Sequence, residues 1–208
     1  MVTDKLDFNS SKRTNVIYYI SDLHLDHKIL KKFPKKATKE KINEYINNIV
    51  LDIFNDLDGR LDYNSYLLIG GDVSFSFEIS KIFYESLAYN ISSVWRNHII
   101  VVLGNHEFWE DSDVDKTIKR YTDLFKSLNI SFLNNELLCI KGSDLIGRKV
   151  KLSENDINNC SEEQLKEICL DSKLLILSGV GFSGLNSQFN ANCGLYRNAI
   201  KTIIIVNY

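Results

Sequence analysis

The fold is decided by the stretch Val16–His27, VIYYISDLHLDH, in a chain of 208 residues. Its first five residues are β-branched, aromatic or aliphatic, which predicts a buried strand. Asp22 and His24 follow the strand, one residue apart, and both are residue types that bind metals. In an α/β sheet the carboxyl end of a strand is where loops gather and ligands bind. The stretch therefore predicts a binding site at one end of a sheet.

Two later segments repeat this arrangement of an apolar run followed by polar ligands. Tyr66–Ile69 runs into Gly70–Asp72, and Ile99–Leu103 runs into Gly104–Glu107, with the sequence GNHE. Three apolar strands thus each deliver oxygen or imidazole ligands at the same relative position. The repetition predicts a metal centre across the carboxyl edge of one sheet.

Amphipathic patterns separate the predicted strands. Apolar residues recur every three or four positions over 42–57, 78–95 and 114–128, which predicts a helix in each range. A strand followed by a helix, three times over, is typical of a largely parallel sheet covered by helices.

Beyond residue 130 the pattern changes to short apolar runs. We expect strands of a second sheet at 130–133, 137–140, 149–152 and 174–177, and a capped helix over 161–170. The glycine-rich segment 179–184 predicts a tight turn, and 203–206 is an apolar tail. The fold class predicted is α/β, a sandwich of two mixed sheets flanked by helices, in one domain spanning residues 1–208.

Composition narrows the classes of partner. A formal net charge of -2 gives no general attraction for nucleic acid, and no apolar run approaches the roughly 20 residues of a membrane helix. The four cysteines show no CxxC spacing, so we interpret them as reduced thiols of a cytoplasmic protein. A nucleic-acid partner and a membrane partner are therefore not expected.

The predicted ligands match the needs of a two-metal hydrolase, in which one carboxylate is shared between two ions. Asp72 is the expected bridge, because the two glycines before it let the backbone approach closely. Asp22 and His24 would hold the first ion, and the Asn105 amide oxygen would help to hold the second. His106 would contact the leaving group or the phosphoryl group as the catalytic residue.

Three further residues are weaker candidates for the site. Glu107 could orient the imidazole of His106 through a hydrogen bond. His27 could line the pocket, although an exposed loop histidine is the plainer interpretation, and Asn186 could contact substrate. Each candidate taken singly also fits a turn or cap role. The ordered set of motifs favours ligands.

The motifs Asp22-Leu23-His24, Gly71-Asp72 and Gly104-Asn105-His106-Glu107, in this order, resemble the calcineurin-like metallophosphoesterase superfamily. The later segments 181–186, 189–191 and 195–197 resemble a bacterial branch of predicted phosphoesterases. The resemblance implies two divalent ions, usually manganese, iron or zinc, and hydrolysis of a phosphate monoester or diester by a metal-bridging hydroxide. It also implies a small-molecule phosphate ester as the substrate.

The sequence departs from this family in one respect. The family supplies further histidines downstream, whereas this chain has only His24, His27, His98 and His106. The second ion would then keep only Asp72 and Asn105 as protein ligands. We expect a C-terminally truncated domain with an incomplete second sheet, whose apolar end invites self-association. Two hypotheses follow: a phosphoesterase, or a non-catalytic remnant or regulatory module that keeps the fold and at most one metal.

Overall fold

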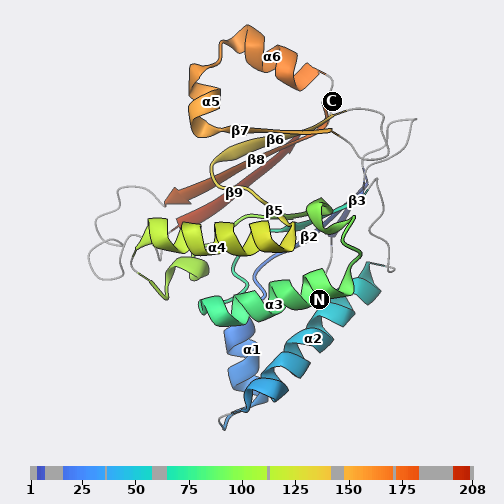
Figure 1. Ribbon diagram of the computed structural model, residues 1–208, viewed down its shortest axis with the longest axis vertical. Coiled ribbons are helices and arrows are strands. Elements are labelled where there is room, and N and C mark those ends of the chain that lie inside the picture. Colours follow the sequence, from blue (N-terminus) through green and yellow to red (C-terminus); the bar gives the residue numbers. More distant parts are fainter. Residues whose placement is uncertain are drawn as a thin grey trace.

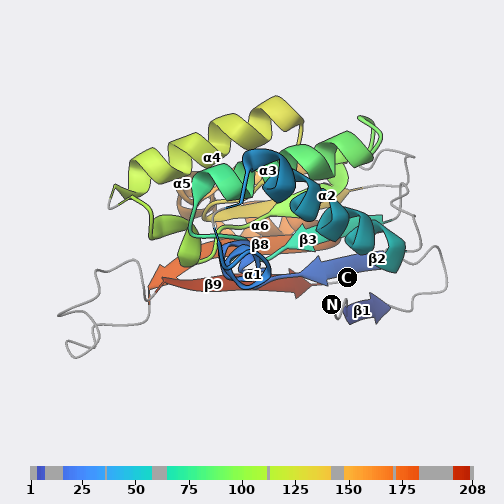
Figure 2. The same ribbon diagram turned by 90° about the horizontal axis from the view of Figure 1, so that it is seen from below.

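The computed structural model describes residues 4–7, 16–35, 37–57, 65–111, 113–141, 148–170, 172–182 and 199–206. Two β-sheets pack against each other. Helices α1–α4 cover the outer face of the first sheet, and α5 and α6 stand at the far side of the second (Figure 1). Figure 2 shows α2, α3 and α4 side by side as one layer. The predicted α/β sandwich flanked by helices is confirmed.

The first sheet has the strand order β1-β2-β3-β4-β5. Strands β2 to β5 run parallel, and β1 pairs antiparallel with β2. Their bounds are β1 Asp4–Asp7, β2 Val16–Ile20, β3 Ser65–Ile69, β4 Ile99–Val101 and β5 Ser131–Phe132. Because β2, β3 and β4 are parallel neighbours, their carboxyl ends meet at one edge of the sheet, as the motif pattern predicts.

Four helices connect these strands: α1 Leu25–Lys32, α2 Lys39–Asp56, α3 Phe77–Asn90 and α4 Val114–Leu128. Helix α4 begins where the Asp113 side chain accepts a hydrogen bond from the Lys116 N–H at 3.0 Å, and it ends at Asn129 in the left-handed conformation. Helix α1 is not predicted by the sequence pattern, because its eight residues are too few to show a periodicity. Helix α3 ends at Asn90, five residues before the predicted end.

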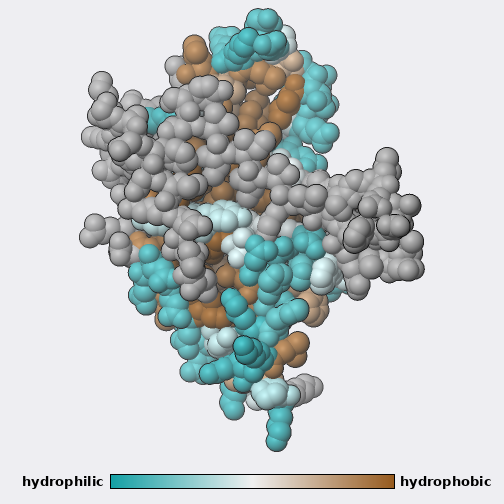
Figure 3. Space-filling view, turned by 180° about the vertical axis from the view of Figure 1, so that it is seen from behind, coloured by the Kyte–Doolittle hydropathy of each residue, from teal (hydrophilic) through white to brown (hydrophobic). Residues whose placement is uncertain are grey.

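The second sheet has the order β7-β6-β8-β9, and its described strands are antiparallel rather than mixed. Its strands are β6 Glu136–Lys141, β7 Arg148–Ser153, β8 Ser172–Phe182 and β9 Ala199–Val206. Helices α5 Glu154–Asn159 and α6 Glu162–Leu170 connect β7 to β8. Seen from behind (Figure 3), the surface over α1 and α2 is mostly hydrophilic, and hydrophobic side chains show beneath α5 and α6.

Two of the predictions for this half of the chain are wrong. The segment 130–133 forms β5, which pairs with β4 in the first sheet, because its short run continues the parallel ladder after α4. The segment 179–182 is no turn: it extends β8, where Gly179 and Gly181 pair with Thr202 and Ile200 of β9. Residues 183 and 184 of the predicted turn lie outside the described residues.

The core consists of two layers, one on each face of the first sheet. Tyr66 and Leu68 of β3 face the second sheet, whereas Leu67 and Ile69 face the helices. All five residues of β3 are buried. A strand that is covered on both faces has apolar residues at consecutive positions. This burial explains why continuous apolar runs, and not alternating patterns, precede the motifs. No helix in the described ranges is both long and apolar enough to cross a membrane.

One charged side chain lies between the sheets. Lys149 of β7 donates a hydrogen bond to the carbonyl of Asn97, and its ammonium stands 5.5 Å from the centre of the Tyr66 ring. Burial lowers the pKa of Lys149 to about 8, because an ammonium loses hydration there. The carbonyl of Asn97 also accepts a bond from the Ser131 hydroxyl at 2.8 Å. The buried ammonium of Lys149 is therefore expected to lower the free energy of unfolding.

Replacing Lys149 with methionine is expected to raise the free energy of unfolding at pH 7 by about 1–3 kcal/mol. The folded pKa lies below the unfolded value of 10.5, so the penalty is complete below pH 8 and disappears as pH rises from 8 to 10.5. Urea denaturation at pH 7 and pH 10 would measure it. The gain should be largest at pH 7. A variant less stable than the wild type at pH 7 would contradict this account.

Candidate metal centre

The three motif loops lie against one another through backbone hydrogen bonds. The N–H of Asp22 donates to the carbonyl of Gly71 at 3.1 Å, and the N–H of His24 donates to the carbonyl of Asp72 at 3.0 Å. Leu25 N–H donates to the Val73 carbonyl at 2.8 Å. The parallel pairing of β2 and β3 thus continues beyond the strands into the loops. It holds the first two motifs side by side.

The backbone is strained at three of the predicted ligands. Five non-glycine residues in the described ranges have a positive φ, and two of them, Asn129 and Asn135, lie outside the motifs. The other three are Asp22 at 57°, His24 at 45° and Asp72 at 55°. Each such conformation costs about 1–2 kcal/mol in an L-residue. Strain of this kind gathers at functional sites, where the surrounding structure holds it in place.

Glycines allow the second and third motifs to touch. A Cβ on Gly71, whose φ is +79°, would lie 2.0 Å from the nitrogen of Gly104, and a Cβ on Gly104 would lie 2.1 Å from Oδ1 of Asp72. That oxygen accepts a hydrogen bond from the N–H of His106 at 3.0 Å. Asp72 is buried at 5% exposure. Its carboxylate therefore stands in the contact between the two loops.

The carboxylate of Glu107 joins the same two loops. Its Oε2 accepts hydrogen bonds from the N–H groups of Asp72 at 3.0 Å and Gly104 at 2.8 Å, and its Oε1 accepts from Val73 at 2.7 Å. Glu107 thus has a structural contact that the sequence did not predict, and its orientation of the His106 imidazole stays a prediction. A carboxylate has two acceptor oxygens, and here both are directed to backbone donors.

Glu107 is 3% exposed, and this burial is the largest cause of its altered pKa. Burial and the nearby negative charge of Asp72 raise the pKa of Glu107 to about 7, although the bonds from Val73 and Asp72 act in the opposite direction. A cation held by Asp72 would offset the repulsion between the two carboxylates. The electrostatics of the site therefore favour a positive charge at Asp72.

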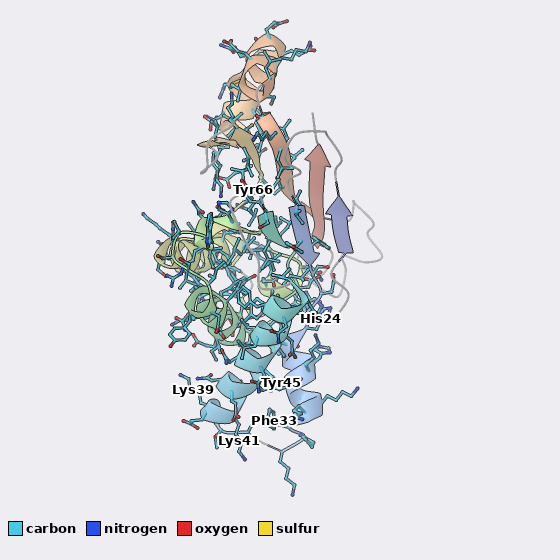
Figure 4. The ribbon with its side chains drawn as sticks, turned by 90° about the vertical axis from the view of Figure 1, so that its right-hand side faces the viewer. His24, Phe33, Lys39, Lys41, Tyr45 and Tyr66 are labelled. Atoms are coloured by element: carbon cyan, nitrogen blue, oxygen red, sulfur yellow. The ribbon has the colours of Figure 1, made fainter. Side chains whose placement is uncertain are left out.

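Three imidazoles gather above these loops. The ring centres of His24 and His106 are 4.3 Å apart, and that of His27 lies 5.8 Å from His24 and 6.4 Å from His106. Trp109 stacks on His106 at 3.7 Å. Burial, more than any nearby charge, lowers the pKa of His106. Figure 4 shows His24 at the end of α1 nearest the sheets, with Phe33 at the opposite end.

The donor atoms fit a divalent ion in chemical type. Nδ1 of His24 and Nδ1 of His106 are buried without a hydrogen-bond partner, a rare state for polar atoms. Oδ1 of Asp22 and Nε2 of His24 are 4.0 Å apart, a separation that two ligands about 2.1 Å from one ion can have. In the part of the chain that the structure describes, no three His, Cys, Asp or Glu side chains already converge on one point. Binding an ion would therefore require side-chain rotation.

Most of the predicted site residues lie at this edge of the sheet. They are Asp22, His24, His27, Asp72, Asn105, His106 and Glu107. Asn186 lies outside the described residues. His98 is elsewhere, stacked on Tyr66 at 4.7 Å with its Nδ1 2.9 Å from the Ser65 carbonyl, so it is not available to the site.

Sequence reasoning missed Asp26, which is buried next to the imidazoles. Its exposure is 3%, and the structure gives neither of its carboxylate oxygens a hydrogen bond. The sequence did contain a sign of this burial: Asp26 is an acidic residue between Leu25 and Ile29, two apolar residues that both face the core. An amphipathic helix does not ordinarily place a carboxylate there.

Glu107→Gln is expected to lower the free energy of unfolding by about 2–3 kcal/mol, because an amide nitrogen would face a backbone N–H where a carboxylate oxygen now accepts. Urea denaturation of the metal-free protein would measure the loss. The control is Glu85→Gln, in an exposed pair with Lys81, which should change stability by less than about 0.5 kcal/mol. Equal effects from the two substitutions would show that the three backbone bonds are dispensable.

Replacing Asp22 with glycine and with alanine separates backbone strain from the loss of the side chain. Both variants lose the carboxylate, but only glycine adopts a φ of 57° without steric cost. The metal-free Asp22→Gly protein should therefore be more stable than Asp22→Ala by about 1 kcal/mol. Chemical denaturation of the two proteins gives the difference directly. Equal stabilities would mean that residue 22 relaxes out of the left-handed region.

Comparison with known proteins agrees with this geometry. The family model described as calcineurin-like phosphoesterase matches residues 16–196, a range that begins at β2 and includes all three motifs. No curated protein and no solved structure matches the chain. The matched range covers most of the 208 residues, and the chain belongs to the calcineurin-like phosphoesterase family.

Proposed function

We propose that this chain is a divalent-metal-dependent phosphoesterase that hydrolyses a small phosphate monoester or diester. The observation that carries the proposal is the meeting of three motif loops at one sheet edge, two of them with a strained backbone, with a buried Asp72 between the second and third loops. Membership of the family supports metal-dependent ester hydrolysis in general. Family membership does not specify that the substrate is a small molecule or that the ester is a monoester or a diester, and both are part of what we propose.

Each proposed ligand would have a role in metal binding that follows from its position. Asp72 would be shared between two ions, because its carboxylate lies where the second and third loops touch. Asp22 and His24, whose Oδ1 and Nε2 atoms are 4.0 Å apart, would complete the first ion's ligands. Asn105 would contribute its amide oxygen to the second ion. Divalent ions held there would activate water for attack on phosphorus and neutralise the charge of the phosphoryl oxygens.

His106 is the proposed catalytic residue. Its backbone is fixed by the bond to Asp72, and its ring is held between His24 and the stacked Trp109. An imidazole so restrained can donate a hydrogen bond to the oxygen of the departing alcohol. The contact with Trp109 also keeps one face of the ring away from water, which strengthens such a bond.

A second candidate function is a non-catalytic module that keeps the fold and at most one ion. The small number of histidines favours it. The chain has four histidines, and one of them, His98, contacts Tyr66 and Ser65 away from the motif loops. Metal stoichiometry separates the two candidates, since the enzyme requires two ions for each chain.

We infer that Mn²⁺ is a suitable ion and that the protein works in the cytoplasm. The predicted ligands are mainly carboxylate and amide oxygens, which suit manganese. Cys139, Cys160 and Cys169 are free thiols, the state maintained in a reducing compartment.

Asp72→Asn is expected to lower hydrolysis of p-nitrophenyl phosphate and its bis-ester by at least about 100-fold. The amide can still accept the bond from His106 N–H, so the fold should persist. The assay uses protein loaded with Mn²⁺, and removal of metal by EDTA should abolish turnover until Mn²⁺ is returned. Asp52→Asn, exposed on α2, is the matched control. Activity retained by Asp72→Asn would exclude the proposed shared ligand.

A further inference from the structure

A lysine-rich segment runs from α1 into the start of α2. Residues 28–41, KILKKFPKKATKEK, contain seven lysines, no arginine and one acidic residue, although the whole chain has a formal net charge of -2. The structure describes six of these lysines, and none of the six forms an ion pair with another described residue. All but the half-buried Lys28 are exposed: Lys31, Lys32, Lys35, Lys39 and Lys41. We call residues 28–41 the basic tip.

The basic tip lies at one end of the molecule. Figure 1 shows α1 and α2 meeting at one end of the longest axis, whereas α5 and α6 stand at the opposite end. Figure 4 shows Phe33, Lys39 and Lys41 together at the end that α1 and α2 share. The positive charge is therefore concentrated where the rest of the fold does not hinder contact with a flat surface.

The backbone of the basic tip is held by contacts within the fold. The N–H of Phe33 donates to the carbonyl of Ile29 at 2.8 Å, and the Phe33 ring meets that of Tyr45 edge to face, with their centres 5.7 Å apart. The Thr38 hydroxyl accepts a hydrogen bond from the Lys41 N–H at 3.5 Å, where α2 begins. The lysines thus extend from a formed turn, and binding would not have to order the backbone.

The basic tip offers both a charged hollow and an apolar side chain. The hollow has a volume of about 310 Å³, and no acidic residue is among the described residues that line it. Leu30, next to Lys31 on α1, is 67% exposed. An apolar side chain among lysines can enter the boundary between lipid headgroups and acyl chains while the lysines contact lipid phosphates. The described residues that line the hollow are Lys32, Phe33, Pro34, Lys35, Ala37, Thr38 and Lys41.

The composition of the basic tip favours a lipid surface over nucleic acid as its partner. Arginine, whose planar guanidinium suits phosphate and nucleic-acid recognition, does not occur in it. Lysine acts as a point charge, which suits the diffuse negative potential of an anionic membrane, and roughly four to eight basic residues are typical of surfaces that bind such lipids. The exposed Leu30 has an apolar partner in a bilayer, but a phosphodiester backbone offers none.

We propose that the basic tip is a docking surface for a membrane that contains anionic lipids. The chain would associate with one face of the bilayer through the lysines and Leu30. The expectation of no membrane partner rests on the absence of a run long enough to span a bilayer, and docking at the surface needs no such run. The inference is independent of the proposed function, since it uses no residue of the candidate metal centre.

The test is co-sedimentation of the full chain with phosphatidylcholine vesicles that contain or lack phosphatidylserine. We expect binding only to vesicles with phosphatidylserine, and an affinity at least about tenfold lower at 1 M than at 0.1 M salt, because salt screens the charges. Joint replacement of Lys31 and Lys35 with glutamine should weaken binding at least about tenfold. The matched control replaces Lys119 and Lys126, two exposed lysines of α4, with glutamine, and should leave binding unchanged.

Leu30→Ser separates a lipid surface from another polyanion, because it retains every lysine of the basic tip. The exposed position of Leu30 leaves little packing to lose. The variant should bind phosphatidylserine vesicles at least about threefold more weakly than wild type.

Three results would overturn the inference: equal binding to both kinds of vesicle, equal losses in the α4 control and the variant at Lys31 and Lys35, and unchanged vesicle binding by Leu30→Ser. Tighter binding to a single-stranded oligonucleotide than to phosphatidylserine vesicles, measured by fluorescence anisotropy, would also overturn it in favour of nucleic acid. A chain that hydrolyses phosphate esters but binds no vesicle refutes only the docking surface. A chain that binds vesicles as expected but hydrolyses no ester refutes only the phosphoesterase.

Discussion

The structure of the candidate metal centre depends on one carboxylate that accepts three backbone hydrogen bonds. Glu107 binds the N–H groups of Asp72, Val73 and Gly104 and so joins the loops after β3 and β4. The left-handed backbone at Asp72 and the close approach of Gly71 to Gly104 both persist within this contact. Without it, the amides would be buried without acceptors. The motif glutamate is thus a structural residue whose removal would disturb the loops that carry Asp72 and Asn105.

At this site, different groups hold the loops in place and face an ion or a substrate. Main-chain bonds hold the loops in place, which leaves the side chains of Asp22, His24 and His106 to meet an ion or a substrate. These side chains are not yet arranged around a common point in the described residues. Their fixed backbones limit how far each can turn, so binding selects among a few rotamers. With the main chain already fixed, ion binding would cost mainly side-chain entropy.

Sequence patterns predicted the strands of the parallel sheet and the helix over 114–128, because each is long or strongly periodic. They failed for segments whose secondary structure depends on pairing with another part of the chain. The two-residue strand β5 is defined only by its bonds to β4, and Gly179 and Gly181 lie in a strand because β9 pairs with β8 there. Asp26 was missed for a similar reason, since its burial depends on how α1 packs. Motif order predicted the site's location, and three-dimensional contacts were needed for its supporting bonds.

The topology of the site has a consequence for folding kinetics. Its candidate ligands follow three parallel strands, with Asp22, Asp72 and Asn105 separated by long stretches of chain. Parallel pairing over such separations is slow, because loop closure must precede the contacts that reward it. The edge that carries the candidate ligands is therefore complete only after β2, β3 and β4 have paired. A bound ion would then act on the native side of the barrier, slowing unfolding and leaving the folding rate nearly unchanged.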